Sequence, residues 1–149
     1  MTPTPGSTFV YTIYIRTTPK KLWSALTNAE FTRQYWFGVS AESDWKAGSP
    51  WKLTFPDGRV ADIGEIVESD PPKRLVIKWR NEFRPELKAE GYSRCTMELE
   101  PNDNGEVKLT ITHTIEQENS QLITAVSGGW PRILSNLKSM IESRELVMD

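Results

Sequence analysis

The chain contains one cysteine and one histidine, Cys95 and His113, and each lies in an alternating apolar stretch. Residues 103–105 join the two stretches, and Gly105 suits the left-handed position of a three-residue hairpin loop. In the register that this loop sets, Cys95 faces His113 with Cβ atoms about 4.5–5.5 Å apart. An imidazole beside a thiol could hold a thiolate and relay its proton. The alternative is a small buried thiol that only packs.

His113 also has an interpretation that does not involve the thiol. It takes an inward position on a strand, residues 107–115, whose inner face is otherwise aliphatic. A ring there could hydrogen-bond a ligand, or it could satisfy a backbone carbonyl. Both interpretations place the imidazole on the inner face of the sheet.

Asp62 is a third candidate, because of the hairpin before it. Asp57 and Gly58 are typical of a two-residue turn, and the register of that turn has three inward pairs: Phe55 with Val60, Leu53 with Asp62, and Trp51 with Gly64. Asp62 would then be a polar group on the tryptophan face, able to act with His113 as general acid and base. One more loop residue would reverse the faces, an outcome that the strand's own apolar residues favour: Ala61, Ile63 and Val67.

Six tryptophans fall in six different segments: Trp23, Trp36, Trp45, Trp51, Trp79 and Trp130. Flat rings that arrive from separate elements do not interdigitate as closely as Leu and Val, so they can line a cavity. Trp23 fits the packing face of a helix and Trp45 falls in a loop. The other four are the candidate lining.

Composition narrows the class of protein. With 18 Lys and Arg against 20 Asp and Glu, the scattered charges give no basic footprint for nucleic acid. One Cys and one His cannot build a zinc site, and we expect no metal and no cofactor. The N-terminus lacks the features of a secretory leader, and no run of about 18 apolar residues occurs. We therefore expect a cytoplasmic protein without a membrane span.

Periodicity predicts the elements that position these residues. Alternation predicts strands over 9–16, 51–55, 60–67, 75–80, 95–99 and 107–115. Thr17 or Thr18 should cap a helix that begins at Pro19, and a second short helix should cover 30–35. Residues 81–91 are charged and predict an exposed, mobile connection. Residues 120–127 predict a helical segment that Gly128 and Gly129 interrupt, and a long amphipathic helix should follow from Pro131.

This order predicts an α+β fold in one domain over residues 1–149: a curved antiparallel sheet of about six to seven strands wrapped around a long C-terminal helix, with two short helices after the first strand. Several stretches fit a known pattern in order and spacing: 20–27, 34–37, 57–58, 64–68, 70–79, 109–113, and 129–130 with Leu134 and Leu137. They resemble the START-like (helix-grip, SRPBCC) superfamily and, within it, the family similar to the activator of heat-shock protein 90 ATPase.

The resemblance implies a cavity between the sheet and the last helix, which in related folds takes lipids, polyketides, sterols or other apolar molecules. Our leading hypothesis is noncatalytic binding of a small apolar or aromatic ligand by ten lining residues: Trp36, Trp51, Phe55, Asp62, Trp79, Met97, Ile111, His113, Trp130 and Leu134. Two alternatives stay open, an activator of a chaperone ATPase and a cyclase or hydrolase that uses His113 and Asp62. A homodimer also stays open.

Overall fold

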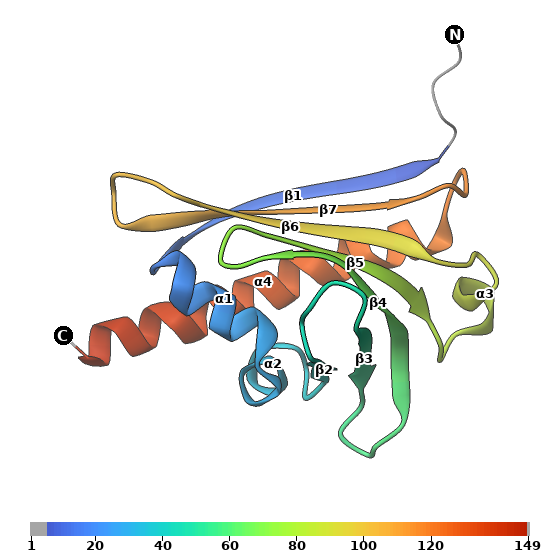
Figure 1. The fold of residues 1–149 in the computed structure, drawn as a ribbon, viewed down its shortest axis with the longest axis horizontal. Coiled ribbons are helices and arrows are strands. Elements are labelled where there is room, and N and C mark those ends of the chain that lie inside the picture. The colour runs from blue at the N-terminus through green and yellow to red at the C-terminus, as the bar shows by residue number, and fades with distance from the viewer. Residues whose placement is uncertain (1–5, 149) are drawn as a thin grey trace, which may run out of the picture.

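The computed structural model describes residues 6–148, which form seven strands and four helices. In chain order these are β1 (Ser7–Arg16), α1 (Pro19–Thr27), α2 (Ala29–Tyr35), β2 (Ser40–Ser43), β3 (Pro50–Thr54), β4 (Val60–Asp70), β5 (Arg74–Asn81), α3 (Pro85–Lys88), β6 (Ser93–Pro101), β7 (Glu106–Ile115) and α4 (Gln121–Met148). The strands form one antiparallel sheet in the order β1-β7-β6-β5-β4-β3-β2. The sheet curves over α4, with α1 and α2 beside that helix (Figure 1). The predicted helix-grip architecture is confirmed.

The first helices begin where their capping residues place them. The Thr18 hydroxyl accepts a hydrogen bond from the Lys21 amide at 3.3 Å, and Pro19 takes the first helical position. Asn28 ends α1 and caps α2 by accepting from the Glu30 amide at 2.9 Å. A single residue between the two helices therefore fixes the turn that delivers Trp36, the residue that ends α2, to the sheet.

The hairpin between β3 and β4 differs from the prediction at its tip and agrees with it further in. The Phe55 amide donates to the Arg59 carbonyl at 2.8 Å, so the loop has three residues, and Gly58 has a positive φ of 93°. A shift of register next to Leu53 compensates for the additional residue. Leu53 still pairs with Asp62, and Trp51 still pairs with Gly64. Because of this bulge, Ala61 and Asp62 are both buried.

The hairpin between β6 and β7 forms in the predicted register. Cys95 pairs with His113, Met97 with Ile111, and Leu99 with Leu109. Gly105 has a φ of 76°, the left-handed conformation that the loop requires. The thiol and the imidazole are therefore cross-strand neighbours.

The prediction that Gly128 and Gly129 interrupt the last helix is wrong. Helix α4 runs without a break from Gln121 to Met148 and contains Pro131. Glycine and proline cost about 1 and 3 kcal/mol in a helix interior. One apolar stripe on both sides of Pro131 is buried against the sheet and outweighs that cost: Leu122, Ile123, Trp130, Ile133, Leu134, Leu137 and Ile141.

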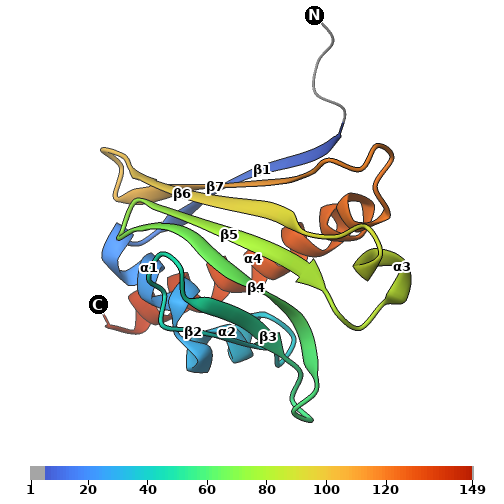
Figure 2. The same ribbon diagram turned by 45° about the vertical axis from the view of Figure 1, so that its right-hand side comes forward.

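Residues 81–91 differ from the predicted exposed connection, because part of the segment is helical and buried. They contain the short helix α3, whose Leu87 is 2% exposed, and they lie beside the first turns of α4 (Figure 2). The Glu90 carboxylate accepts hydrogen bonds from the amides of Gln121 and Leu122, at 2.8 and 3.4 Å, and from the Ser120 hydroxyl. A carboxylate at a helix N-terminus satisfies amides that have no partner within the helix. Glu90 thus holds this segment against α4.

None of the helices over residues 6–148 is long and apolar enough to cross a membrane. The expectation about a secretory leader rests in part on residues 1–5, which lie outside the described residues.

Strands β4 and β5 approach each other closely at Gly64. A Cβ added at Gly64 would overlap the backbone carbonyl oxygen of Lys78, whereas one added at Gly128 in α4 would meet nothing within 4 Å. We expect Gly64→Ala to lower the free energy of unfolding by about 2–3 kcal/mol. Gly128→Ala should raise it by about 0.5–1 kcal/mol. Urea denaturation of both variants checks this pair, and equal effects at the two sites would contradict the close approach.

Candidate functional site

Trp79 on β5 lies at the centre of the aromatic residues. Its ring centroid lies 4.6 Å from that of Trp51, 5.9 Å from Trp36, 5.8 Å from Trp130 and 5.1 Å from His113. These rings come from the end of α2, from β3 and β7, and from α4. The cluster therefore joins the sheet to α2 and α4. Trp51 and Trp79 pair with Gly64 from opposite sides, and their rings pack against each other.

A buried chain of hydrogen bonds fixes the state of His113. The Trp130 indole Nε1–H donates to His113 Nδ1 at 3.2 Å, so Nδ1 carries no proton. The proton of the neutral ring is then on Nε2, which donates to the Ser93 hydroxyl at 2.8 Å. Ser93 in turn donates to the Trp79 carbonyl at 3.0 Å. Both ring nitrogens of His113, the Trp130 indole N–H and the Ser93 hydroxyl hydrogen therefore have hydrogen-bond partners.

Burial keeps His113 neutral. The residue has no exposed surface, and burial lowers the pKa of its imidazole from 6.5 to about 4. Burial also raises the pKa of the Cys95 thiol well above its usual range, which leaves it a protonated, poorly reactive side chain. Because both ring nitrogens bond to other residues, the pair has the contacts of core residues and not those of a nucleophile and its base.

Asp62 is the second buried polar group beside Trp79, and its situation is different. Its side chain is 6% exposed, and Oδ2 accepts from the Trp79 indole Nε1–H at 2.7 Å and from Asn81 Nδ2 at 3.5 Å. Among residues 6–148, no donor bonds to the other oxygen, Oδ1. Burial is the main cause that raises the pKa of Asp62 from 3.8 to about 6, and the nearby Glu82 charge adds to it.

The carboxylate of Asp62 faces a cleft of about 160 Å³ at one end of the interface between the sheet and α4. Tryptophan rings, aliphatic side chains and three polar residues form its wall: Trp36, Leu53, Asp62, Trp79, Asn81, Phe83, Arg84, Leu87, Leu122, Ala125, Val126, Gly129, Trp130 and Ile133. No group of three or more His, Cys, Asp or Glu side chains in the described part of the chain is arranged to hold a metal ion. The cleft is thus a mostly apolar site with one acidic group.

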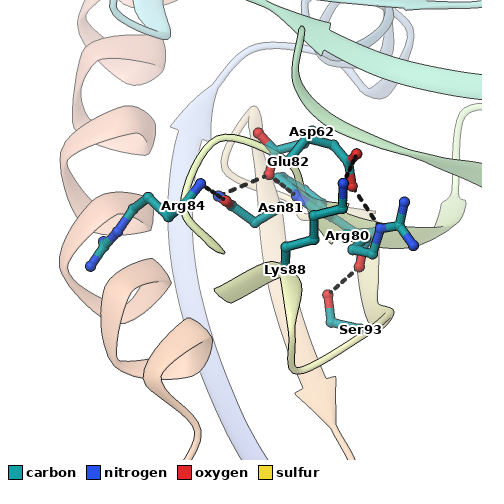
Figure 3. A network of polar contacts seen from close by, with 8 residues as sticks. Asp62, Arg80, Asn81, Glu82, Arg84, Lys88 and Ser93 are labelled. Carbon is teal, nitrogen blue, oxygen red and sulfur yellow. Dashed lines mark hydrogen bonds and ion pairs between the residues drawn. The ribbon is translucent and has the colours of Figure 1, made fainter. Parts of the chain in front are cut away.

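Charged side chains at the end of β5 and in α3 pair with one another near Asn81, as Figure 3 shows for Arg80, Glu82 and Lys88. Glu82 pairs with Arg80 at 2.6 Å and with Lys88 at 3.2 Å, and the Arg84 guanidinium pairs with Glu86 at 2.8 Å. The Asn81 side chain joins this segment to the cleft, because it donates to Asp62 and accepts from the Arg84 amide at 2.9 Å.

Four of the ten predicted lining residues lie in the wall of the cleft: Trp36, Asp62, Trp79 and Trp130. The structure places the other six outside it. Met97 and Ile111 of the sheet and Leu134 of α4 are buried in the core, and Trp51 packs against Trp79. His113 bonds to Trp130 and Ser93, and Phe55 packs edge-on against Phe83, 5.1 Å away, at the rim.

Apart from Leu53 on β3, the wall residues that were not predicted come from two places, residues 81–91 and helix α4. Asn81, Phe83, Arg84 and Leu87 belong to the segment predicted as an exposed connection, where Leu87 is the apolar residue whose burial marks the fold-back. Leu122 and Val126 precede Trp130 by two turns and one turn of the same helix. Residues four and eight positions before Trp130 lie on the same helix face as Trp130. A prediction of one continuous helix would therefore have identified both.

Residues 16–142 match the family model described as "Activator of Hsp90 ATPase homolog 1-like protein". The chain belongs to this family. Within the fold, the match runs from the last residue of β1 to the seventh turn of α4 and includes every residue of the cleft wall. No curated protein matches the chain in sequence.

Solved structures of similar fold cover nearly all of the chain. Protein MLL2253 from Mesorhizobium loti has a TM-score of 0.78 and 21% identity, over 92% of this chain and 98% of that one. An HSP90 activator from Plasmodium falciparum, PFC0360w, has a TM-score of 0.72 and 25% identity, over 91% and 96%. The Aha1 dimer from Colwellia psychrerythraea has a TM-score of 0.70 and 18% identity, over 89% and 93%.

The raised pKa of Asp62 predicts a stability that depends on pH. Between pH 3.8 and about 6 the folded protein binds more protons than the unfolded chain, so this carboxyl lowers stability as the pH rises through that window. Asp62→Asn removes the charge and keeps an acceptor for the Trp79 indole. Its advantage in unfolding free energy over the wild type should grow by up to about 3 kcal/mol between pH 4 and 7.

Urea denaturation followed by circular dichroism across this pH range measures that advantage. Asp57→Asn is a suitable control, because hydrogen bonds from the Arg59 amide and guanidinium lower the pKa of the exposed Asp57. Because the pKa of Asp57 is at or below 3.8 in both the unfolded and the folded state, its relative stability should change little between pH 4 and 7. A pH-independent effect of Asp62→Asn would contradict the uncompensated buried charge.

His113 is the single histidine, so its ring can be followed by NMR without assignment variants. We expect the Nε2–H tautomer, with ring resonances that do not shift between about pH 8 and 5.5. Ser93→Ala should lower the free energy of unfolding by about 1–3 kcal/mol, since it leaves the buried Nε2–H without its partner. A titration midpoint near 6.5 in the wild type would contradict the hydrogen-bonded chain.

Proposed function

We propose that the protein binds a small, mostly apolar organic molecule in the cleft beside Trp79 and Trp130. The observation that carries this proposal is the composition of the wall, in which indole rings and aliphatic side chains surround one buried carboxylate with a free oxygen. Ligand sites are typically apolar hollows with a few fixed polar groups. Apolar burial would supply the affinity, and Asp62 would orient the polar end of the ligand.

The volume of the cleft limits the size of the ligand. An apolar cavity of about 150 Å³ holds a molecule the size of benzene, so a cleft of about 160 Å³ accommodates roughly ten heavy atoms when part of the ligand projects to solvent. At about 0.5 kcal/mol per heavy atom, such a ligand gains about 5 kcal/mol, which corresponds to a Kd of about 0.2 mM. Binding in this range is detected by titration at millimolar ligand.

Catalysis by His113 and Asp62 finds less support in this geometry. His113 is outside the cleft wall, and both of its ring nitrogens bond to protein groups. A general acid or base has to reach a proton of the substrate. Asp62 alone meets that requirement, and we assign it a binding role.

Two adjacent glycines provide a matched test. Gly129 lines the cleft, Gly128 is exposed on the same helix, and an added Cβ meets nothing within 4 Å at either position. Gly129→Leu should fill the cleft and weaken binding of small aromatic compounds at least about tenfold, the loss expected when a ligand of this size forfeits about 1.4 kcal/mol. Gly128→Leu should leave the Kd unchanged. Tryptophan fluorescence and calorimetric titration measure both, and equal affinities in the two variants would contradict binding in the cleft.

A second candidate function is stimulation of a heat-shock-protein-90-type ATPase. It is favoured by the family and by the structure of the Plasmodium falciparum HSP90 activator, which matches almost the full length of both chains at 25% identity. A surface mechanism should tolerate a filled cleft. Chaperone ATPase assays with Gly129→Leu therefore separate the two candidates: stimulation that survives this variant favours the surface mechanism, and stimulation that is lost links it to the cleft.

A further inference from the structure

The charge of Asp62 has no cationic partner in the cleft. Arg84 is the other charged residue of the wall, but its guanidinium pairs with Glu86, and its side chain extends away from Asp62 (Figure 3). Arg80 and Lys88 both pair with Glu82. The two groups that bond to Asp62 are the neutral donors of Trp79 and Asn81. The electrostatic neighbour that affects it is the like charge of Glu82.

The other elements that face Asp62 supply no cation either. Helix α4 presents aliphatic residues, a glycine and Trp130 to the cleft, while β3 presents Leu53 and the end of α2 presents Trp36. A buried carboxylate without a counter-charge is costly, and a positive charge that bonds to it recovers part of that cost. The free Oδ1 is the atom that such a charge would reach.

We propose that the ligand is a small organic cation, a protonated amine on an apolar or aromatic skeleton of about ten heavy atoms. This inference rests on the proposed function and names the chemical class of its ligand. The ammonium donates to Asp62 Oδ1, and the skeleton lies against Trp79, Trp130 and Val126. The neighbouring indole rings add a favourable environment for a cation.

Other ligand classes fit the site less well. An anion would meet the charges of Asp62 and Glu82, while the nearest guanidinium, that of Arg84, is already paired. A neutral alcohol could donate to Oδ1 but would leave the buried charge uncompensated. A metal ion would find a single carboxylate, since the described residues contain no group of three or more potential ligands.

Three probes of nearly equal shape test the proposal: 2-phenylethylamine, 2-phenylethanol and 3-phenylpropionate. At neutral pH the amine should bind the wild type at least about tenfold more tightly than the alcohol, and the propionate should bind most weakly. In Asp62→Asn the ratio between the amine and the alcohol should fall to about one. Glu65→Gln, which removes an exposed charge from the same strand, should keep the wild-type ratio. Calorimetric titration gives all these constants.

A pH series adds a second measurement. The amine stays protonated over the whole range, so its preference should fade as the pH drops below the Asp62 pKa of about 6. If amine and alcohol bind the wild type equally, and Gly129→Leu still weakens both, the cation proposal is overturned and the cleft remains a binding site. If no probe binds the wild type at millimolar concentration, both proposals fail.

Discussion

Two indole N–H groups are buried where the sheet meets α4, and each needs an acceptor that the aliphatic core cannot supply. Trp130 finds His113, and Trp79 finds Asp62. The histidine needs a partner in turn, which is Ser93, and the aspartate gains a second donor from Asn81. These four polar residues therefore serve the two indoles directly or in turn, and together with Trp79 and Trp130 they connect β4, β5, β6, β7 and α4.

The two acceptors do not stabilise the fold equally. His113 is a neutral ring with both nitrogens satisfied, and its low pKa keeps it neutral wherever the protein is folded at ordinary pH. Asp62 bonds through one oxygen and is charged above a pH of about 6, at a cost in stability. A neutral amide at that position would accept the same indole N–H without the charge. The charge of Asp62 thus destabilises the fold, although a neutral acceptor would be enough for its structural role. Destabilising groups of this kind are typical of functional sites.

Much of this arrangement followed from the sequence, because β-hairpin register depends on a few local features. Gly105 and the alternation of β6 and β7 were enough to pair Cys95 with His113. Between β3 and β4 the predicted pairing of Leu53 with Asp62 is confirmed, although two errors in the expected path cancel: the loop is one residue longer, and a bulge next to Ala61 restores the register. The hydrogen-bond partners of His113, the continuity of α4 and the extent of the cavity depend on contacts between distant elements, which local periodicity does not contain.

The cleft exists because α4 carries small residues where its buried face passes Trp79. Ala125 and Gly129 lie one turn apart on that face, and both line the cleft. Further along the helix, Leu134, Leu137 and Ile141 fill the equivalent space and close the core. A glycine at this place costs about 1 kcal/mol of helix stability relative to alanine. The same helix therefore completes a solid core over one half of the sheet and leaves room over the other. That room lies beside Asp62, whose Oδ1 accepts no hydrogen bond from the described residues.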